Sequence, residues 1–300
     1  MSSSTDNGVP WQGVLVATAL PLREDLSVDY DAYAAHCAWL IAEGCDGVVP
    51  NGSLGEYQTL TPGERSQVVR TAVEAIGADR VIPGVAAYGA AEARRWTEDA
   101  ADAGCPAVLL LPPNAYRASI PAVRAHYAEV ARTGVPIVAY NNPIDTKVDL
   151  VPELLADLYH DGHIVAVKEF SGDVRRAYQL AELAPGLDLL IGADDVLLEL
   201  AVAGAKGWVA GYPNALPAST VKLYRAAVAG DLESALPLYR LLHPLLRWDS
   251  RTEFVQAIKL SMDLVGRYGG PCRAPRGPLT AEQEKAVRGA TEQAVALGLA

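Results

Sequence analysis

The stretch Ile164–Phe170, "IVAVKEF", places a charged side chain directly after a short apolar run. The four residues before the charge are aliphatic and mostly β-branched, a composition typical of a strand buried on both faces. The next residue is Lys168, and burying an ammonium group there is costly unless it loses its proton or meets a compensating charge. The stretch therefore predicts a buried parallel strand and a lysine whose position needs an explanation.

Seven further runs of the same kind occur along the chain, so the sequence predicts eight strands. They are Val14–Thr18, Gly47–Asn51, Val81–Val85, Ala107–Leu111, Pro136–Tyr140, Ile164–Lys168, Leu187–Ile191 and Gly207–Ala210. Amphipathic segments separate them, and several of these segments end at a glycine, the common helix stop. Repeated strand–helix units predict an α/β protein with the fold of a (β/α)₈ TIM barrel.

The predicted organisation is a tail over residues 1–12, a barrel over 13–217 and a helical extension packed on it over 218–300. A doubly wound open sheet is the alternative. Its GxGxxG fingerprint is missing after the first strand, which continues as "VATALPL".

The composition excludes several classes of function. A net charge of -11 disfavours a nucleic-acid surface, which needs clustered Lys and Arg. No apolar run reaches the length of a membrane span, and the polar start "MSSSTDNG" does not resemble a signal peptide. The four cysteines lack metal or redox spacing. We expect a cytoplasmic protein with reduced thiols, no membrane contact and no nucleic-acid partner.

Active sites of (β/α)₈ barrels lie at the carboxyl ends of the strands. In this sequence polar and Gly/Pro-rich segments follow those ends, among them "NGSLGE", "YNNP", "GADD" and "GYPN". We take the candidates for substrate contacts from these segments. They are Ser53, Leu54, Asn142, Asp145, Gly192, Asp194 and Gly211.

Lys168 ends the sixth predicted strand, so its amine would lie in the barrel mouth. Desolvation there lowers the pKa of a lysine, and a neutral amine attacks carbonyl groups to form an imine. The alternative is an ion pair with Glu169 or another carboxylate and no further role. Tyr140 ends the preceding strand and could transfer protons beside the lysine, or only cap the core.

The "NGSLGE" turn could hold a carboxylate on its backbone N–H groups. Asp194 and Asp195 lack a third ligand at suitable spacing, so no metal site is predicted. No nucleotide-binding motif is present either, and we expect no cofactor.

Four motifs together resemble the dihydrodipicolinate synthase / N-acetylneuraminate lyase family of Schiff-base barrel enzymes. They are "GSLGEYQTLTPGER", "YNNP", "VAVKEFSGD" and the glycine-rich eighth strand followed by "NALP". The resemblance runs from about Gly13 to Pro278 and implies that Lys168 forms a Schiff base with a 2-oxo acid or its cyclic imine. It implies proton transfer by Tyr140, carboxylate binding by Ser53 and the backbone of Ser53 and Leu54, and a homotetramer built as a dimer of dimers.

The sequence departs from the synthase branch at three places. Asp145 stands where that branch has an arginine for a second carboxylate, and Ser53 and Leu54 replace two threonines. Ala115 replaces a relay tyrosine, although Tyr116 follows it. Asp145 could instead point outward and pair with Lys147 or Arg117. The sialic-acid branch fits less well, because "GWVAGYPN" replaces its Ser/Thr cluster on the eighth strand.

A closer likeness within the family is to Δ1-pyrroline-4-hydroxy-2-carboxylate deaminases, carried by "LLPPNAYRA", "VKEFSGDVRR" and "RAPRGPL". The resemblance implies a reaction that gives 2,5-dioxopentanoate and ammonia. An acid in place of the synthase arginine suits a substrate with one carboxylate and a developing cation. The alternatives are another 2-oxo acid aldolase or dehydratase, a dihydrodipicolinate synthase-like enzyme, and a catalytically silent binding barrel.

Overall fold

The protein is described by a computed structural model covering residues 9–113 and 117–300. Eight parallel strands form one sheet in the order β2-β1-β8-β7-β6-β5-β4-β3. They are β1 Gly13–Ala17, β2 Gly47–Val49, β3 Gly84–Val85, β4 Val108–Leu110, β5 Ile137–Asn141, β6 Ala166–Glu169, β7 Asp188–Ile191 and β8 Gly207–Ala210. Each of the eight predicted strands overlaps one of these.

The two end strands of that order meet and close the barrel. Val48 and Val81 form a parallel bridge. The Ile82 N–H donates to the Val48 carbonyl at 3.0 Å, and the Gly84 N–H donates to the Pro50 carbonyl at 2.7 Å. Pro83 has no N–H to donate, which shortens β3 relative to its prediction. The protein is therefore a (β/α)₈ TIM barrel.

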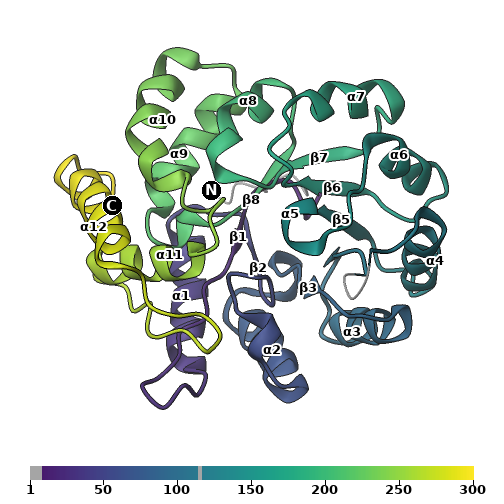
Figure 1. The fold of residues 1–300 in the computed structure, drawn as a ribbon, viewed down its shortest axis with the longest axis horizontal. Helices are drawn as coiled ribbons and strands as arrows, with labels where there is room; N and C mark the ends of the chain where they lie inside the picture. The colour runs from purple at the N-terminus through teal and green to yellow at the C-terminus, as the bar shows by residue number, and fades with distance from the viewer. Residues whose placement is uncertain (1–8, 114–116) are drawn as a thin grey trace, which may run out of the picture.

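Helices alternate with the strands and surround them (Figure 1). They are α1 Tyr30–Ala42, α2 Pro62–Ile76, α3 Ala90–Asp102, α4 Ile120–Ala131, α6 Pro152–His160, α7 Arg175–Leu183, α8 Leu197–Val202 and α9 Pro217–Val228, with a single turn α5 Pro143–Thr146 after β5. Three more helices follow: α10 Leu232–Leu246, α11 Phe254–Leu264 and α12 Ala281–Ala296. In the described ranges, no helix is both long and apolar enough to cross a bilayer.

The C-terminal helices gather at one side of the barrel, where α10 packs on α8 and α9, and α11 packs on α12 (Figure 1). Inside the barrel a smaller core contains Leu15, Val49, Val138 and Leu190. Because successive side chains of a strand point to opposite faces, residues two apart share the interior. This alternation carries the side chain of Tyr140, two residues after Val138, to the barrel interior.

Candidate active site

A cavity of about 400 Å³ lies at the carboxyl ends of the strands. Seven of the residues predicted from the sequence to act in catalysis or substrate binding line it: Ser53, Leu54, Tyr140, Asn142, Asp145, Lys168 and Gly211. They come from separate parts of the chain, and the barrel brings them together.

Lys168 and Tyr140 are direct neighbours on paired strands, β6 and β5. The Lys168 Nζ lies 4.3 Å from the centroid of the Tyr140 ring and 5.7 Å from that of Phe170. Lys168 is only 6% exposed. Burial lowers its pKa, although the carboxylates of Asp249 and Asp194 act in the opposite direction. The arrangement favours the neutral amine that nucleophilic attack requires.

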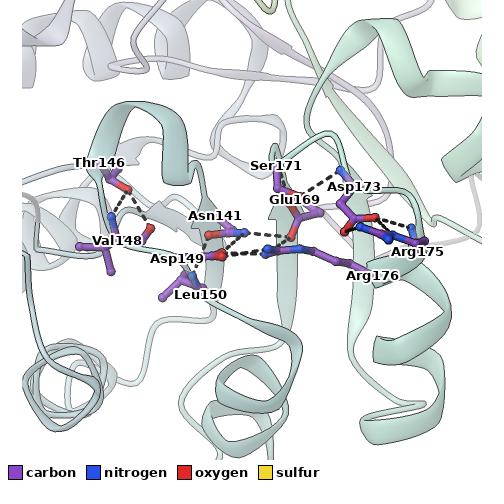
Figure 2. A network of polar contacts seen from close by, with 10 residues as sticks. All are labelled: Asn141, Thr146, Val148, Asp149, Leu150, Glu169, Ser171, Asp173, Arg175 and Arg176. Carbon is purple, nitrogen blue, oxygen red and sulfur yellow. Dashed lines mark hydrogen bonds and ion pairs between the residues drawn. The ribbon is translucent and has the colours of Figure 1, made fainter.

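The side chain of Glu169 belongs to a network of polar contacts with Asn141, Ser171 and Arg176 (Figure 2). Its carboxylate accepts from Asn141 Nδ2 at 3.0 Å and from the Ser171 N–H at 2.5 Å, and Arg176 lies 3.8 Å away. Among the described residues, no carboxylate lies within 4.0 Å of Lys168 Nζ. The alternative of a Lys168–Glu169 ion pair is therefore excluded.

A short chain of hydrogen bonds links Tyr140 to Asp145. Asn142 Nδ2 donates to the Tyr140 hydroxyl oxygen at 3.2 Å and to Asp145 Oδ2 at 2.8 Å. The Asp145 N–H donates back to Asn142 Oδ1 at 3.1 Å. Asp145 is exposed and lines the cavity, while Lys147 Nζ donates to the Ile144 carbonyl and not to Asp145. Because Asn142 donates to the phenol oxygen, the Tyr140 O–H proton remains free to reach a substrate.

The glycine-rich turn between β2 and α2 is held by a buried ion pair. Glu56 ends the turn in the left-handed backbone region at φ 54°, and Lys259 Nζ on α11 lies 2.7 Å from its Oε1. The Arg273 N–H donates to the other carboxylate oxygen at 2.9 Å. Both members of the pair are almost fully buried. The C-terminal helices thereby fix the turn that carries Ser53 and Leu54.

We predict that Lys259→Met lowers the free energy of unfolding by about 3–5 kcal/mol, because it leaves Glu56 buried without its counter-charge. Urea unfolding measures this loss. The double variant Glu56→Gln/Lys259→Met should recover much of it. As a control, Arg288→Met removes the exposed pair with Glu284 (3.0 Å) and should cost no more than about 1 kcal/mol. Equal losses at the two sites would contradict the prediction.

Two predicted residues lie outside the cavity lining. Asp194 is fully buried, and its carboxylate accepts from Trp208 Nε1 at 2.9 Å and from the Tyr212 N–H at 2.9 Å. Gly192 packs so closely that an added Cβ would lie 2.3 Å from the Glu169 carbonyl oxygen. Both residues shape the ends of β6 to β8 instead of facing the cavity. Ala115 and Tyr116 fall outside the described residues.

The C-terminal extension adds lining residues that the sequence analysis did not predict. Asp249 and Arg251 lie between α10 and α11, and Arg276 lies between α11 and α12. Arg276 Nη2 donates to the Ser53 carbonyl at 3.4 Å, which places a cation beside the proposed carboxylate-binding turn. The described residues contain no cluster of three or more His, Cys, Asp or Glu that could hold a metal ion.

The sequence and the fold were compared with those of known proteins. The sequence matches the dihydrodipicolinate synthetase family over residues 10–294. It is 33% identical over 281 residues to a 4-hydroxy-tetrahydrodipicolinate synthase of Methanothrix thermoacetophila, covering 93% of this chain and 95% of the relative. A synthase of the same name from Anaeromyxobacter sp. strain K is 34% identical over 287 residues, covering 93% and 96%. The solved dihydrodipicolinate synthase of Aquifex aeolicus superposes with a TM-score of 0.89 at 27% identity, covering 96% and 99%.

Proposed function

The chain belongs to the dihydrodipicolinate synthetase family of aldolases and lyases, and we propose that Lys168 forms its Schiff base with Δ1-pyrroline-4-hydroxy-2-carboxylate. The products of the proposed reaction are 2,5-dioxopentanoate and ammonia. One observation carries the Schiff-base proposal: a buried lysine, with no carboxylate of the described residues within 4.0 Å of its amine, faces the cavity beside Tyr140. A homotetramer remains a prediction.

The reaction begins with attack of the neutral Lys168 amine on C2 of the ring imine. The bond from C2 to the ring nitrogen breaks, which leaves a Schiff base on Lys168 and an amine on C5. Tyr140 lies beside the lysine and would help remove a C3 proton as the C4 hydroxyl leaves as water. The elimination leaves a double bond between C3 and C4, and a proton shift from C5 to C3 converts it to an enamine at C4 and C5. This enamine tautomerises to an imine at C5, and hydrolysis there releases ammonia. A second hydrolysis frees the product from Lys168.

The site offers matching charges for such a substrate. The backbone at Ser53 and Leu54 would hold the substrate carboxylate, and Arg276 beside Ser53 would add a positive charge. Asp145 lines the same cavity, where its carboxylate would stabilise the amine that ring opening creates.

A synthase-like reaction is the second candidate, because Arg251 and Arg276 both line the cavity and could bind a second carboxylate. The names of the relatives also support it. An assay panel with the pyrroline, pyruvate and other 2-oxo acids separates the two candidates. We expect ammonia and 2,5-dioxopentanoate in equal amounts from the pyrroline. Condensation of pyruvate with an aldehyde, without ammonia from the pyrroline, would replace the deaminase proposal with the synthase one.

We predict that Asp145→Arg lowers kcat/KM for the pyrroline by about tenfold or more, because it places a cation near the C5 amine. Asp145→Asn should show a smaller loss, since an amide still accepts the hydrogen bond from Asn142. Steady-state kinetics of both variants measure the effect. Glu153→Arg, the same charge reversal on the exposed first turn of α6, is the control. Unchanged kcat/KM for Asp145→Arg would remove this electrostatic support for the deaminase.

A further inference from the structure

Asp249 is a buried carboxylate on the connection between α10 and α11, and it lines the same cavity as Lys168. Gly211 at the end of β8 makes room for it, because an added Cβ would lie 2.5 Å from Asp249 Oδ1. The other oxygen, Oδ2, accepts from the Asp194 N–H at 3.4 Å, a long hydrogen bond. The fold therefore directs a weakly bonded carboxyl group into the reaction space.

The neighbouring carboxylate of Asp194 has a structural role. It accepts hydrogen bonds from Trp208 Nε1 and from the backbone N–H groups of Gly211 and Tyr212. These contacts use its lone pairs and keep it behind the cavity wall. Of the two buried acids near Lys168, Asp249 is the one placed to exchange a proton with a bound molecule.

We propose that Asp249 is the catalytic acid that completes Schiff-base formation on Lys168, and that it then serves as counter-ion of the iminium. This role rests on the proposed Schiff-base function, but it holds for any 2-oxo acid or cyclic imine. No motif in the sequence indicated it.

The proposed step starts from the adduct in which Lys168 Nζ is already bonded to C2. The Asp249 carboxyl group gives its proton to the leaving atom, which is the C2 hydroxyl oxygen of a 2-oxo acid adduct or the ring nitrogen of the pyrroline. The C2 bond to that atom breaks and its electron pair stays with the leaving group, which departs as water or as the C5 amine. The lone pair of Nζ forms the C=N bond. A neutral adduct and a neutral acid thus give an iminium cation and a carboxylate anion.

The electrostatics of the site suit this exchange. Burial and the negative charge of Asp194 raise the pKa of Asp249 well above its usual range, while Lys168 acts against the shift. Asp195 adds to the rise. Burial raises the pKa values of Tyr140 on β5 and of Tyr212 just after β8, and both side chains interact electrostatically with the Asp249 carboxylate. Arg251 lies on the same connection as Asp249. A carboxyl group is a stronger acid than a buried phenol, so Asp249 is the better proton donor here.

Rapid-quench borohydride trapping with pyruvate as the probe tests the proposal, with the adduct on the Lys168 peptide measured by mass spectrometry. We expect Asp249→Asn to slow adduct formation by about 10²–10³-fold, because an amide has no acidic proton to give. In the wild type the rate of adduct formation should fall as the pH rises and Asp249 loses its proton. The pH profile of Asp249→Asn should lack this fall. Gly211→Ala keeps the carboxyl but displaces it, so it should also slow trapping.

Asp188→Asn is the matched control, because Asp188 binds Trp11 and Gln12 at the amino end of β7 and should leave trapping unchanged. If Asp249 only supports the Asp194 N–H, the asparagine variant keeps that acceptor, and an unaltered rate and pH profile would overturn the proposal. If Asp249→Asn does not fold, Gly211→Ala provides the test. A trapping rate for Gly211→Ala equal to that of the wild type would then overturn the proposal. A wild type that forms no adduct at all refutes the Schiff-base function itself, a separate outcome.

Discussion

Lys168→Met is expected to abolish imine formation and to lower turnover by about 10⁴-fold or more, the scale for loss of a covalent nucleophile. Methionine fills the space of the lysine stem between the rings of Tyr140 and Phe170 but has no amine. Borohydride treatment in the presence of substrate should add mass to the Lys168 peptide of the wild type and none to the variant. Lys222→Met, at an exposed position on α9, controls for the loss of a lysine as such. A trapped adduct on another residue would contradict this mechanism.

The same variant has a pH-dependent effect on stability. Because burial lowers the pKa of Lys168 in the folded protein, the unfolded chain binds more protons between the folded and the ordinary lysine pKa. Wild-type stability therefore rises with pH through that window. The Tm of Lys168→Met relative to wild type should be highest at the acidic side of the window. The difference should shrink as the pH approaches the ordinary lysine pKa, which thermal unfolding across the pH range can measure.

Tyr140→Phe is expected to lower kcat by roughly 10²–10⁴-fold, the usual contribution of a general acid–base group. The ring and its edge-to-face contact with Phe170 remain, so only the hydroxyl that accepts from Asn142 is lost. Steady-state kinetics of the purified variant measure the change.

Tyr127→Phe on α4 is the control for Tyr140→Phe. Tyr127 is also buried, and its hydroxyl donates to the Leu110 carbonyl at 3.0 Å, outside the cavity. Its loss should cost about 1 kcal/mol of stability and leave kcat unchanged. If Tyr140→Phe behaves in the same way, Tyr140 only caps the core.

The eight strands were predictable because strands covered on both faces are continuous apolar runs, a signal that depends only on neighbouring residues. The residues at which the strands begin and end were harder to predict. The third predicted strand began at Val81, yet Pro83 interrupts the ladder and only Gly84–Val85 remains. The positions of Lys168 and Tyr140 followed from the fold, since residues that end neighbouring parallel strands must lie at the same mouth.

Asp249 and Arg276 could not be predicted in the same way. They lie in connections between C-terminal helices, and their approach to the cavity depends on how α10 and α11 pack against the barrel. The spacing of residues along the sequence does not predict how these helices pack. For Asp194 the sequence predicted too much. Its place after β7 suggested a cavity residue, but the fold turns its carboxylate toward Trp208 and the backbone of Tyr212. Side-chain direction at a turn is set by hydrogen bonds that sequence periodicity does not encode.

The spread of the cavity lining from Ala17 to Arg276 has a consequence for biosynthesis. A nascent chain that has left the ribosome only as far as Ala210 contains every strand and Lys168, but not Asp249, Phe254 or Arg276. We expect its barrel mouth to lack part of its cover, so that water reaches further toward the amine. A hydrated lysine carries a proton at neutral pH and does not attack carbonyls. On the proposed Schiff-base mechanism, we therefore expect the Lys168 amine to become reactive only when the last helices dock, which would spare the unfinished chain from covalent reaction with metabolites around it.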